Sequence, residues 1–332
     1  MNRSYLRAGL IGLGVMGRHH ARVLAQLDDV ELVAVVDPFH SDRPPQGIRL
    51  VDSVQDLIKI GIDYAVVACP TDLHEEVGVA LAEAGVRALI EKPLAHTVES
   101  ARVLVDAFDS HGLTAAVGHI ERYNPALQNL RSRLSAGELG DVYQVATRRQ
   151  GPFPSRISDV GVVNDLASHD IDLTAWITAA DYATVSARTA RRSGREHEDM
   201  VVIVGELNDG TVVSHVVNWL SPFKERFTIV SGERGSFVAD TLTADLTFHA
   251  NGALSTQWEA LRNFRGVAEG DVTRFALAKP EPLVIEHERF RDAVCGRPAE
   301  LVTLREASRT VEVCAAVLES ATSGATVRTD RE

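Results

Sequence analysis

The 332-residue sequence lacks several features that mark whole classes of protein. It contains no apolar run of the ~18 residues that a bilayer-spanning helix needs. Its only cysteines, Cys69, Cys295 and Cys314, are widely spaced and form no CxxC zinc motif. The net charge of −12 opposes binding to a phosphate backbone. We therefore expect a cytoplasmic protein with reduced thiols and with neither nucleic acid nor membrane as a partner.

Lysine is also scarce, supplying only four of the 34 basic residues. This arginine bias, with abundant alanine and valine, indicates a high-GC bacterial gene. Single hydrophobic cores stop growing at about 250–300 residues, so the length predicts two domains. We place the boundary so that the domains comprise residues 1–122 and 123–332.

The first domain alternates short apolar runs with helical periods. Strands are expected over residues 6–13, 31–36, 64–68 and 88–90, and helices over 17–27 and 74–84. Unbroken apolar strands separated by helices are typical of a parallel sheet covered on both faces. The pattern predicts an α/β fold with a doubly wound Rossmann sheet.

The second domain is expected to be α/β with an open, mostly antiparallel sheet. Strands are predicted over residues 183–188, 200–206, 211–219, 227–231 and 236–240, with a hairpin at Asn208-Asp209-Gly210. Residues 137–149 are expected to form a turn and a further strand. Helices are predicted over 125–136, 164–177, 284–294 and 304–319, and a loop over 251–283.

The stretch AGLIGLGVMGRHH, residues 8–20, has two incompatible interpretations. It resembles the core of a signal peptide, but it ends in Gly-Arg-His-His instead of a small-residue cleavage site. It also matches a strand that turns through Gly12, Gly14 and Gly17 into a helix. In that context the three glycines allow a tight turn, close approach of a pyrophosphate and close helix packing. We favour the dinucleotide-binding interpretation over a plain turn because Asp37 ends the next strand at the expected distance.

Asp37 points to the cofactor that this loop would bind. A carboxylate accepts hydrogen bonds from a ribose but repels a 2′-phosphate, and Pro38-Phe39 adds no positive charge. We therefore predict NAD, although Arg43 leaves NADP open.

Lys92 directly follows an apolar strand in the sequence Glu91-Lys92-Pro93. Ligands bind at the carboxyl ends of parallel strands, where an ammonium can stabilise a developing alkoxide. The alternative is an ordinary solvated lysine.

Three titratable residues recur within GVVNDLASHDIDLTAWI, residues 161–177. Asp165, His169 and Asp172 are spaced to share one face of an α-helix. A histidine beside a carboxylate is a suitable general base for an alcohol. A solvated face or a metal pair are the alternatives, but no further ligands appear at metal-site spacing, so we predict no metal.

With these motifs in place, the sequence resembles the Gfo/Idh/MocA oxidoreductases nearly from end to end. The resemblance rests on AGLIGLGVMGRHHARVL, VVDP, ACPTDLHEEV, EKPLA, GHIERYNPA, DLASHDIDLTAWI and ESATSG. It implies that Lys92, Asp165 and His169 are catalytic, and that homodimers or homotetramers form through the second domain's sheet. The implied cofactor contacts are Gly12, Gly14, Val15, Met16, Gly17, Asp37, Pro38, Cys69, Pro70, Thr71, His74, Glu91 and Lys92.

Within the family, GHIERYNPA and DLASHDIDL look most like the branch of UDP-N-acetylglucosamine 3-dehydrogenases and related sugar 3-dehydrogenases. That likeness implies oxidation of a sugar C3 hydroxyl, commonly ahead of transamination, with His119, Arg122, Tyr123 and Asn124 beside the sugar. An aminoglycoside or cyclitol of an antibiotic pathway is an alternative substrate, which the acidic cluster at 196–199 would suit unless it is a solvated turn. An NAD(P)H-dependent 3-ketoreductase of an NDP-sugar and a non-catalytic dinucleotide sensor are further alternatives.

Overall fold

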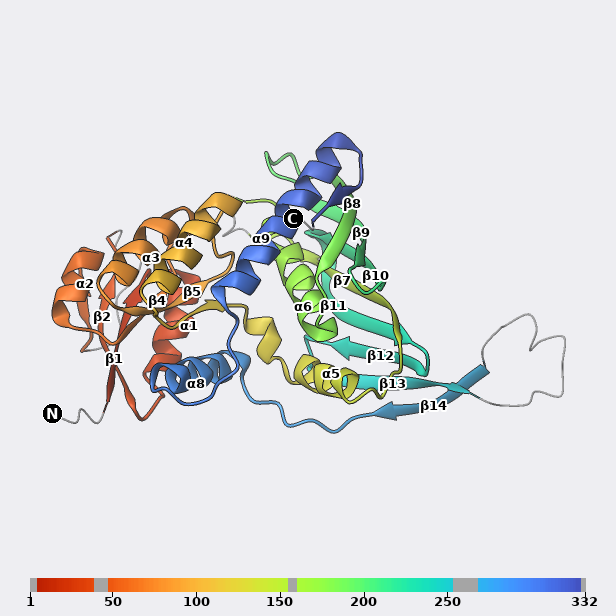
Figure 1. Ribbon diagram of the computed structural model, residues 1–332, viewed down its shortest axis with the longest axis horizontal. Helices are drawn as coiled ribbons and strands as arrows, with labels where there is room; N and C mark the ends of the chain where they lie inside the picture. The colour runs from red at the N-terminus through yellow and green to blue at the C-terminus, as the bar shows by residue number, and fades with distance from the viewer. Residues whose placement is uncertain (1–4, 39–46, 155–159, 253–267, 330–332) are drawn as a thin grey trace. The chain divides into compact units, whose positions relative to one another are not determined.

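A computed structural model describes residues 5–38, 47–154, 160–252 and 268–329 of the chain and divides it into two compact units (Figure 1). Unit 1 comprises Met1–Ile120 and Glu281–Glu312, and unit 2 comprises Glu121–Pro280 and Val313–Glu332. The predicted boundary at residue 122 is close to the first crossing between units. The predicted second domain needs correction, however, because Glu281–Glu312 belongs to unit 1.

Unit 1 contains a six-stranded parallel sheet in the order β3-β2-β1-β4-β5-β6. The strands are β1 (Leu6–Ile11), β2 (Val30–Val36), β3 (Arg49–Val51), β4 (Tyr64–Val67), β5 (Arg87–Glu91) and β6 (Ala115–Gly118). The strand order reverses between β1 and β4, which is where a doubly wound sheet binds its ligand. The Rossmann prediction is confirmed. Of residues 8–20, which resemble the core of a signal peptide, 8–11 belong to β1 in the middle of the sheet and 15–20 to helix α1 (Val15–Leu24).

Helices cover both faces of this sheet because its strand residues alternate between two hydrophobic cores. Leu10 packs into one core with α1 (Val15–Leu24) and α8 (Pro282–Val294). Ile11 packs into the other with α2 (Val54–Ile60), α3 (His74–Glu83) and α4 (Val98–Ser110). Strands β3 and β6 and helices α2 and α4 were not predicted.

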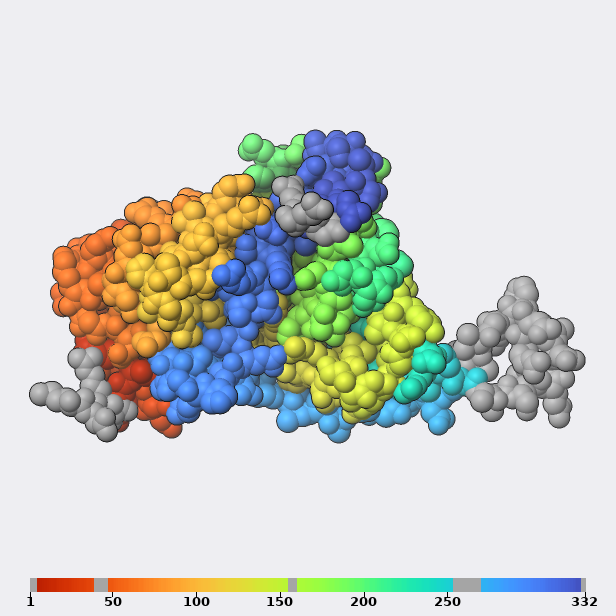
Figure 2. All heavy atoms as spheres, viewed as in Figure 1, coloured from red at the N-terminus to blue at the C-terminus, as the bar shows by residue number. Residues whose placement is uncertain are grey.

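The packing of helix α8 explains why residues 281–312 belong to unit 1 and not to the predicted second domain. Its Phe290 is 1% exposed and meets the ring of Tyr64 of β4 edge to face, with ring centroids 5.4 Å apart. Figure 2 shows the pale blue atoms of α8 beside the red atoms of the N-terminal elements, although the two segments are far apart in the sequence. Packing against the first sheet, which no local pattern reveals, assigns this helix to unit 1.

Unit 2 contains a nine-stranded sheet in the order β14-β13-β12-β11-β7-β10-β9-β8-β15. The strands are β7 (Val142–Pro152), β8 (Tyr182–Ala190), β9 (Met200–Leu207), β10 (Val212–Asn218), β11 (Leu220–Gly232), β12 (Gly235–Asp240), β13 (Asp245–Gly252), β14 (Ala268–Arg274) and β15 (Val327–Arg328). Only the β7–β10 pairing is parallel among those described, so the sheet is mixed and mostly antiparallel, as predicted. The hairpin at 208–210 is confirmed. The predicted loop over 251–283 needs correction, because it contains β14 and the start of α8, while residues 253–267 lie outside the described part.

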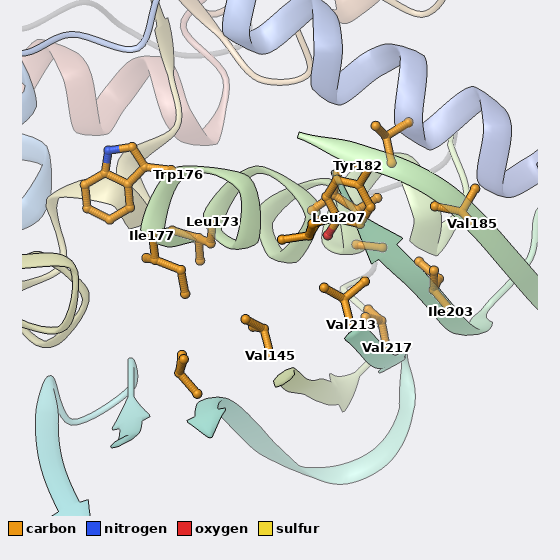
Figure 3. Close-up of a cluster of buried hydrophobic side chains, with 14 of the residues drawn as sticks. Val145, Leu173, Trp176, Ile177, Tyr182, Val185, Ile203, Leu207, Val213 and Val217 are labelled. Atoms are coloured by element: carbon orange, nitrogen blue, oxygen red, sulfur yellow. The ribbon is translucent and has the colours of Figure 1, made fainter. Parts of the chain in front are cut away.

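One face of this sheet packs against helices α5 (Pro125–Ser135) and α6 (Ser168–Thr178). Figure 3 shows Leu173 and Ile177 of α6 above strand residues that include Val145 and Val213. Helix α9 (Leu304–Ser323) adds Val317 to the same core. No helix in the described residues is long and apolar enough to cross a membrane.

Candidate active site

The glycine loop follows β1 at the carboxyl edge of the parallel sheet. Gly12 has a φ of +92°, and a Cβ there would lie 2.6 Å from the carbonyl oxygen of Ala68. A Cβ on Gly17 would lie 2.0 Å from the carbonyl oxygen of Gly12. Both positions therefore require glycine.

Gly14 differs from these two, because a Cβ there would meet no atom of the described residues within 4 Å. Gly14 is the N-cap residue of α1, and the first turn of that helix contains Val15, Met16 and Gly17. The open approach and the helix N-terminus together fit the pyrophosphate of a dinucleotide.

Asp37 follows β2 and orders this loop from the side. It is 3% exposed, and its Oδ2 accepts a hydrogen bond from the Leu13 amide at 3.2 Å. Pro38 next to it is exposed, whereas Phe39 and Arg43 lie outside the described residues. Contact of Asp37 with a ribose stays a prediction.

His74 connects the ends of β4 and β5. Its Nδ1 lies 3.1 Å from the Pro93 carbonyl oxygen, and its Nε2 lies 3.1 Å from that of Cys69. Burial lowers the pKa of His74, while its bonds to carbonyl oxygens act in the opposite direction. The predicted residues Cys69, Pro70 and Thr71 begin the segment that His74 holds, and burial raises the pKa of the Cys69 thiol to about 12.

Lys92 and Glu91 occupy the end of β5. Lys92 is partly exposed, and it precedes a cis-proline. The buried Glu91 carboxylate accepts hydrogen bonds from the Lys92 amide at 3.1 Å and from His20 Nε2 at 2.8 Å. Its carboxylate thus supports the turn from inside, and contact with the cofactor stays a prediction.

Asp165 and His169 lie on a helical segment of unit 2 that differs from the expected single α-helix. Residues Val163–Ala167 form a π-helix, η3, in which the Ser168 amide donates to the carbonyl of Val163, five residues back. The prediction assumed a regular α-helix at this point, and the placement of Asp165 and His169 on one face stays a prediction. Both side chains are buried, at 5% and 8% exposure. Such π-turns frequently occur at functional sites.

Glu198 holds the beginning of this segment. Its backbone carbonyl accepts from the Val162 amide at 3.0 Å, and its Oε1 accepts from the Val163 amide at 3.1 Å. The neighbouring Asp199, 1% exposed, accepts from the amides of Arg192 and Ser193 through Oδ2. Two members of the acidic cluster at 196–199 therefore form hydrogen bonds within the fold. This weakens the proposal that the cluster attracts a polycationic substrate.

Asp172 pairs with a predicted substrate residue instead of completing a catalytic face. Its carboxylate accepts from Arg122 Nε at 2.8 Å and from Nη2 at 2.6 Å, and both side chains are buried. Arg122 lies in η2 (Ile120–Tyr123), and Asn124 caps α5 by accepting from the Ala126 amide at 3.0 Å. Tyr123 and His119 are also buried. Contact of these four residues with a sugar stays a prediction.

Two residues that the sequence did not mark belong to the surroundings of this site. His20 of α1 and His287 of α8 are fully or nearly fully buried and lie behind Glu91. A lone histidine carries no local signal of such a contact. In the described residues, no group of three or more His, Cys, Asp or Glu side chains could hold a metal ion.

Comparison with known proteins identifies the family. Residues 6–119 match the oxidoreductase family with an NAD-binding Rossmann fold, and residues 127–238 match the GFO/IDH/MocA C-terminal domain. The UDP-N-acetylglucosamine 3-dehydrogenase of Acidithiobacillus ferrooxidans is 34% identical over 63% of this chain and 66% of its own. A solved structure of that enzyme matches this structure with a TM-score of 0.83 at 27% identity. The match covers 96% of this chain and 98% of the chain in that structure.

Two further relatives are a myo-inositol dehydrogenase and a protein of gentamicin A biosynthesis. Myo-inositol dehydrogenase Hyg17 of Streptomyces leeuwenhoekii is 31% identical over 70% of this chain and 75% of its own. The structure of GenD2 from gentamicin A biosynthesis, in complex with NAD, has a TM-score of 0.81 at 25% identity over 99% of this chain and 97% of its own. The predicted NAD cofactor and oxidoreductase activity on hydroxyl groups are confirmed. The chain belongs to the Gfo/Idh/MocA family of NAD-dependent oxidoreductases.

Proposed function

We propose that this enzyme oxidises a secondary ring hydroxyl, at C3, of a sugar or sugar nucleotide to a ketone, ahead of transamination. The observation that carries the proposal is the likeness to UDP-N-acetylglucosamine 3-dehydrogenase over nearly the whole fold. The glycine loop, whose shape suits a pyrophosphate, supports the cofactor half of the reaction.

Each titratable residue has one proposed task. Bound NAD supplies the hydride acceptor. His169 takes the proton of the substrate hydroxyl as general base, and Asp165 orients it. The Lys92 ammonium stabilises the negative charge that develops on the hydroxyl oxygen. His119, Arg122, Tyr123 and Asn124 are proposed to contact the sugar directly or to shape its surroundings.

Substitution of the proposed catalytic residues tests these tasks. We expect Lys92→Ala and His169→Gln to lower kcat for UDP-N-acetylglucosamine by about 10²-fold or more, the usual contribution of such groups. NADH binding, followed by fluorescence, should change little in both variants. Lys59→Ala is the matched control, because Lys59 is an exposed lysine paired with Asp56. Wild-type turnover by Lys92→Ala would contradict the role of Lys92.

A second candidate substrate is a cyclitol or aminoglycoside hydroxyl in antibiotic biosynthesis. It is favoured by the likeness to GenD2 and to Hyg17. NADH formation with UDP-N-acetylglucosamine, inositols and an aminoglycoside series would distinguish the two candidates. Consumption of NADPH with a keto-sugar would instead indicate a ketoreductase, and tight NAD binding without turnover would indicate a sensor.

We also propose that the chain forms homodimers or homotetramers through the outer face of the unit 2 sheet. Val204, Val212 and Ile229 are exposed there on β9, β10 and β11. The use of NAD and three free cysteines, all in the described part of the chain, support a cytoplasmic location.

A further inference from the structure

A chain of buried polar side chains connects three elements of unit 1 behind Lys92. Glu91 ends β5, His20 lies on α1, and His287 lies on α8. His20 Nε2 lies 2.8 Å from Glu91 Oε1, and His20 Nδ1 lies 2.8 Å from His287 Nε2. The exposed fractions of Glu91, His20 and His287 are 8%, 0% and 1%. Polar groups buried this deeply are costly unless they bond to one another, so the chain constrains all three elements.

The two end members of this row of side chains, Glu91 and His287, differ in charge. Burial acts to raise the pKa of Glu91, but the hydrogen bond and charge of His20, together with the charge of Lys92, lower it overall. Burial, aided by the charge of His20, holds the pKa of His287 well below its usual value. His20 therefore lies between an ionised carboxylate and a neutral imidazole.

Glu286, next to His287 on α8, shows how strongly this region resists a second negative charge. It is 1% exposed, and its carboxyl oxygens hydrogen-bond to none of the described residues. Burial and the nearby Glu91 charge raise its pKa well above the usual value. The pKa values of Glu91 and Glu286 thus shift in opposite directions, and of the two it is Glu91 that hydrogen-bonds to His20.

We propose that His20 is a positioning residue for Lys92: its hydrogen bond fixes the Glu91 carboxylate, and that carboxylate in turn holds the Lys92 amide. His287 anchors His20 from the opposite side. Because His20 lies on α1, whose N-cap residue is Gly14, these hydrogen-bonded side chains connect the cofactor loop to the lysine within one unit. The inference deepens the proposed function, which assigns Lys92 to the reacting hydroxyl.

Two substitutions of His20 separate its contacts. Glutamine places an amide donor near the position of Nε2 and preserves the bond to Glu91, whereas asparagine mimics Nδ1 and preserves only the bond to His287. The readout is acylation of Lys92 by an amine-reactive ester at pH 8, quantified by peptide mass spectrometry on the full chain. The other lysines, Lys59, Lys224 and Lys279, are exposed and serve as internal references.

We expect Lys92 to be acylated about threefold faster or more in His20→Asn, since a carboxylate that His20 no longer holds leaves the segment around Lys92 freer to open to the reagent. Glu91→Gln, whose single carbonyl oxygen cannot replace both acceptor atoms of the carboxylate, should do the same. His20→Gln should behave like the wild type. Glu286→Gln should also behave like the wild type, because the Glu286 carboxyl group hydrogen-bonds to none of the described residues. The three reference lysines should be unaffected in every variant.

Equal acylation in His20→Gln and His20→Asn would overturn the proposal, as would an unchanged Lys92 rate in Glu91→Gln. If His20→Asn fails to fold, the Lys92 acylation rates of Glu91→Gln and His20→Gln still test the proposal. The assay contains no substrate, so it gives the same answer whether or not Lys92 acts in turnover. Failure of the proposed function would instead appear as full activity in Lys92→Ala.

Discussion

At the scale of single residues, Gly14 and Gly17 separate cofactor binding from folding. A Cβ on Gly17 would collide with the Gly12 carbonyl, whereas one on Gly14 would meet none of the described atoms within 4 Å. We expect Gly17→Ala to lower the free energy of unfolding by about 2 kcal/mol or more. Gly14→Ala should change it by less than about 0.5 kcal/mol.

The two variants should also differ in cofactor affinity. Gly14→Ala should weaken NAD at least about tenfold, because its methyl group occupies the approach of the pyrophosphate. Denaturant unfolding and NADH fluorescence titration measure the two effects. Unchanged NAD affinity in a stable Gly14→Ala would contradict the assignment of this loop.

Glu286 makes a pH-dependent contribution to stability. Its pKa in the folded protein is raised well above the usual 4.5, so the folded state retains a proton that the unfolded state releases. The free energy of unfolding therefore falls as pH rises above about 4.5, by up to about 1.4 kcal/mol per pH unit from this group. Glu286→Gln should be more stable than the wild type at pH 7.5, and this gain should disappear near pH 4.

Thermal unfolding across this pH range measures the difference. Glu288→Gln, on the same helix but less buried, is the control. A pH-independent effect of Glu286→Gln would show that the acid is ionised in the folded state.

At the scale of elements, the Arg122–Asp172 ion pair connects η2 to α6. The two side chains are 6% and 1% exposed, and the guanidinium also lies 5.8 Å from the centroid of the Trp176 ring. Removing one partner leaves a buried charge without compensation, so Asp172→Ala should cost about 3–5 kcal/mol. Glu312→Gln, which breaks the exposed Arg102–Glu312 pair, should cost less than about 1 kcal/mol.

Urea unfolding followed by tryptophan fluorescence measures both changes. The double variant Arg122→Met with Asp172→Leu should recover most of the loss, since no charge is then left buried. Failure of the double variant to recover stability would point to a further role for Arg122.

At the scale of the whole molecule, cofactor binding should stabilise the fold. A ligand present at 100 times its Kd adds about 2.7 kcal/mol to the free energy of unfolding. We expect NAD to raise the melting temperature and NADP to raise it less, because Asp37 repels a 2′-phosphate. An equal shift with NADP would contradict the proposed contact of Asp37.

The apolar outer face of the unit 2 sheet predicts self-association. Val204 and Ile229 are 51% and 36% exposed on β9 and β11. Lysine at both positions should convert the oligomer to a monomer in light-scattering measurements without lowering stability, because neither side chain belongs to the core. Val103→Lys, at an exposed valine on α4, should leave the oligomer intact.

The sequence by itself determined the Rossmann sheet, the NAD loop and the family, because those features depend on local spacing. Gly12, Gly17 and Asp37 act within one turn of chain or at the end of an adjacent strand, where periodicity is informative. Only the tertiary structure decided that α8 packs on the first sheet, that β7 pairs parallel to β10, and that η3 has a π-turn. Those outcomes, and the burial of His20 against Glu91 and His287, depend on contacts between residues far apart in the chain, which no local pattern encodes.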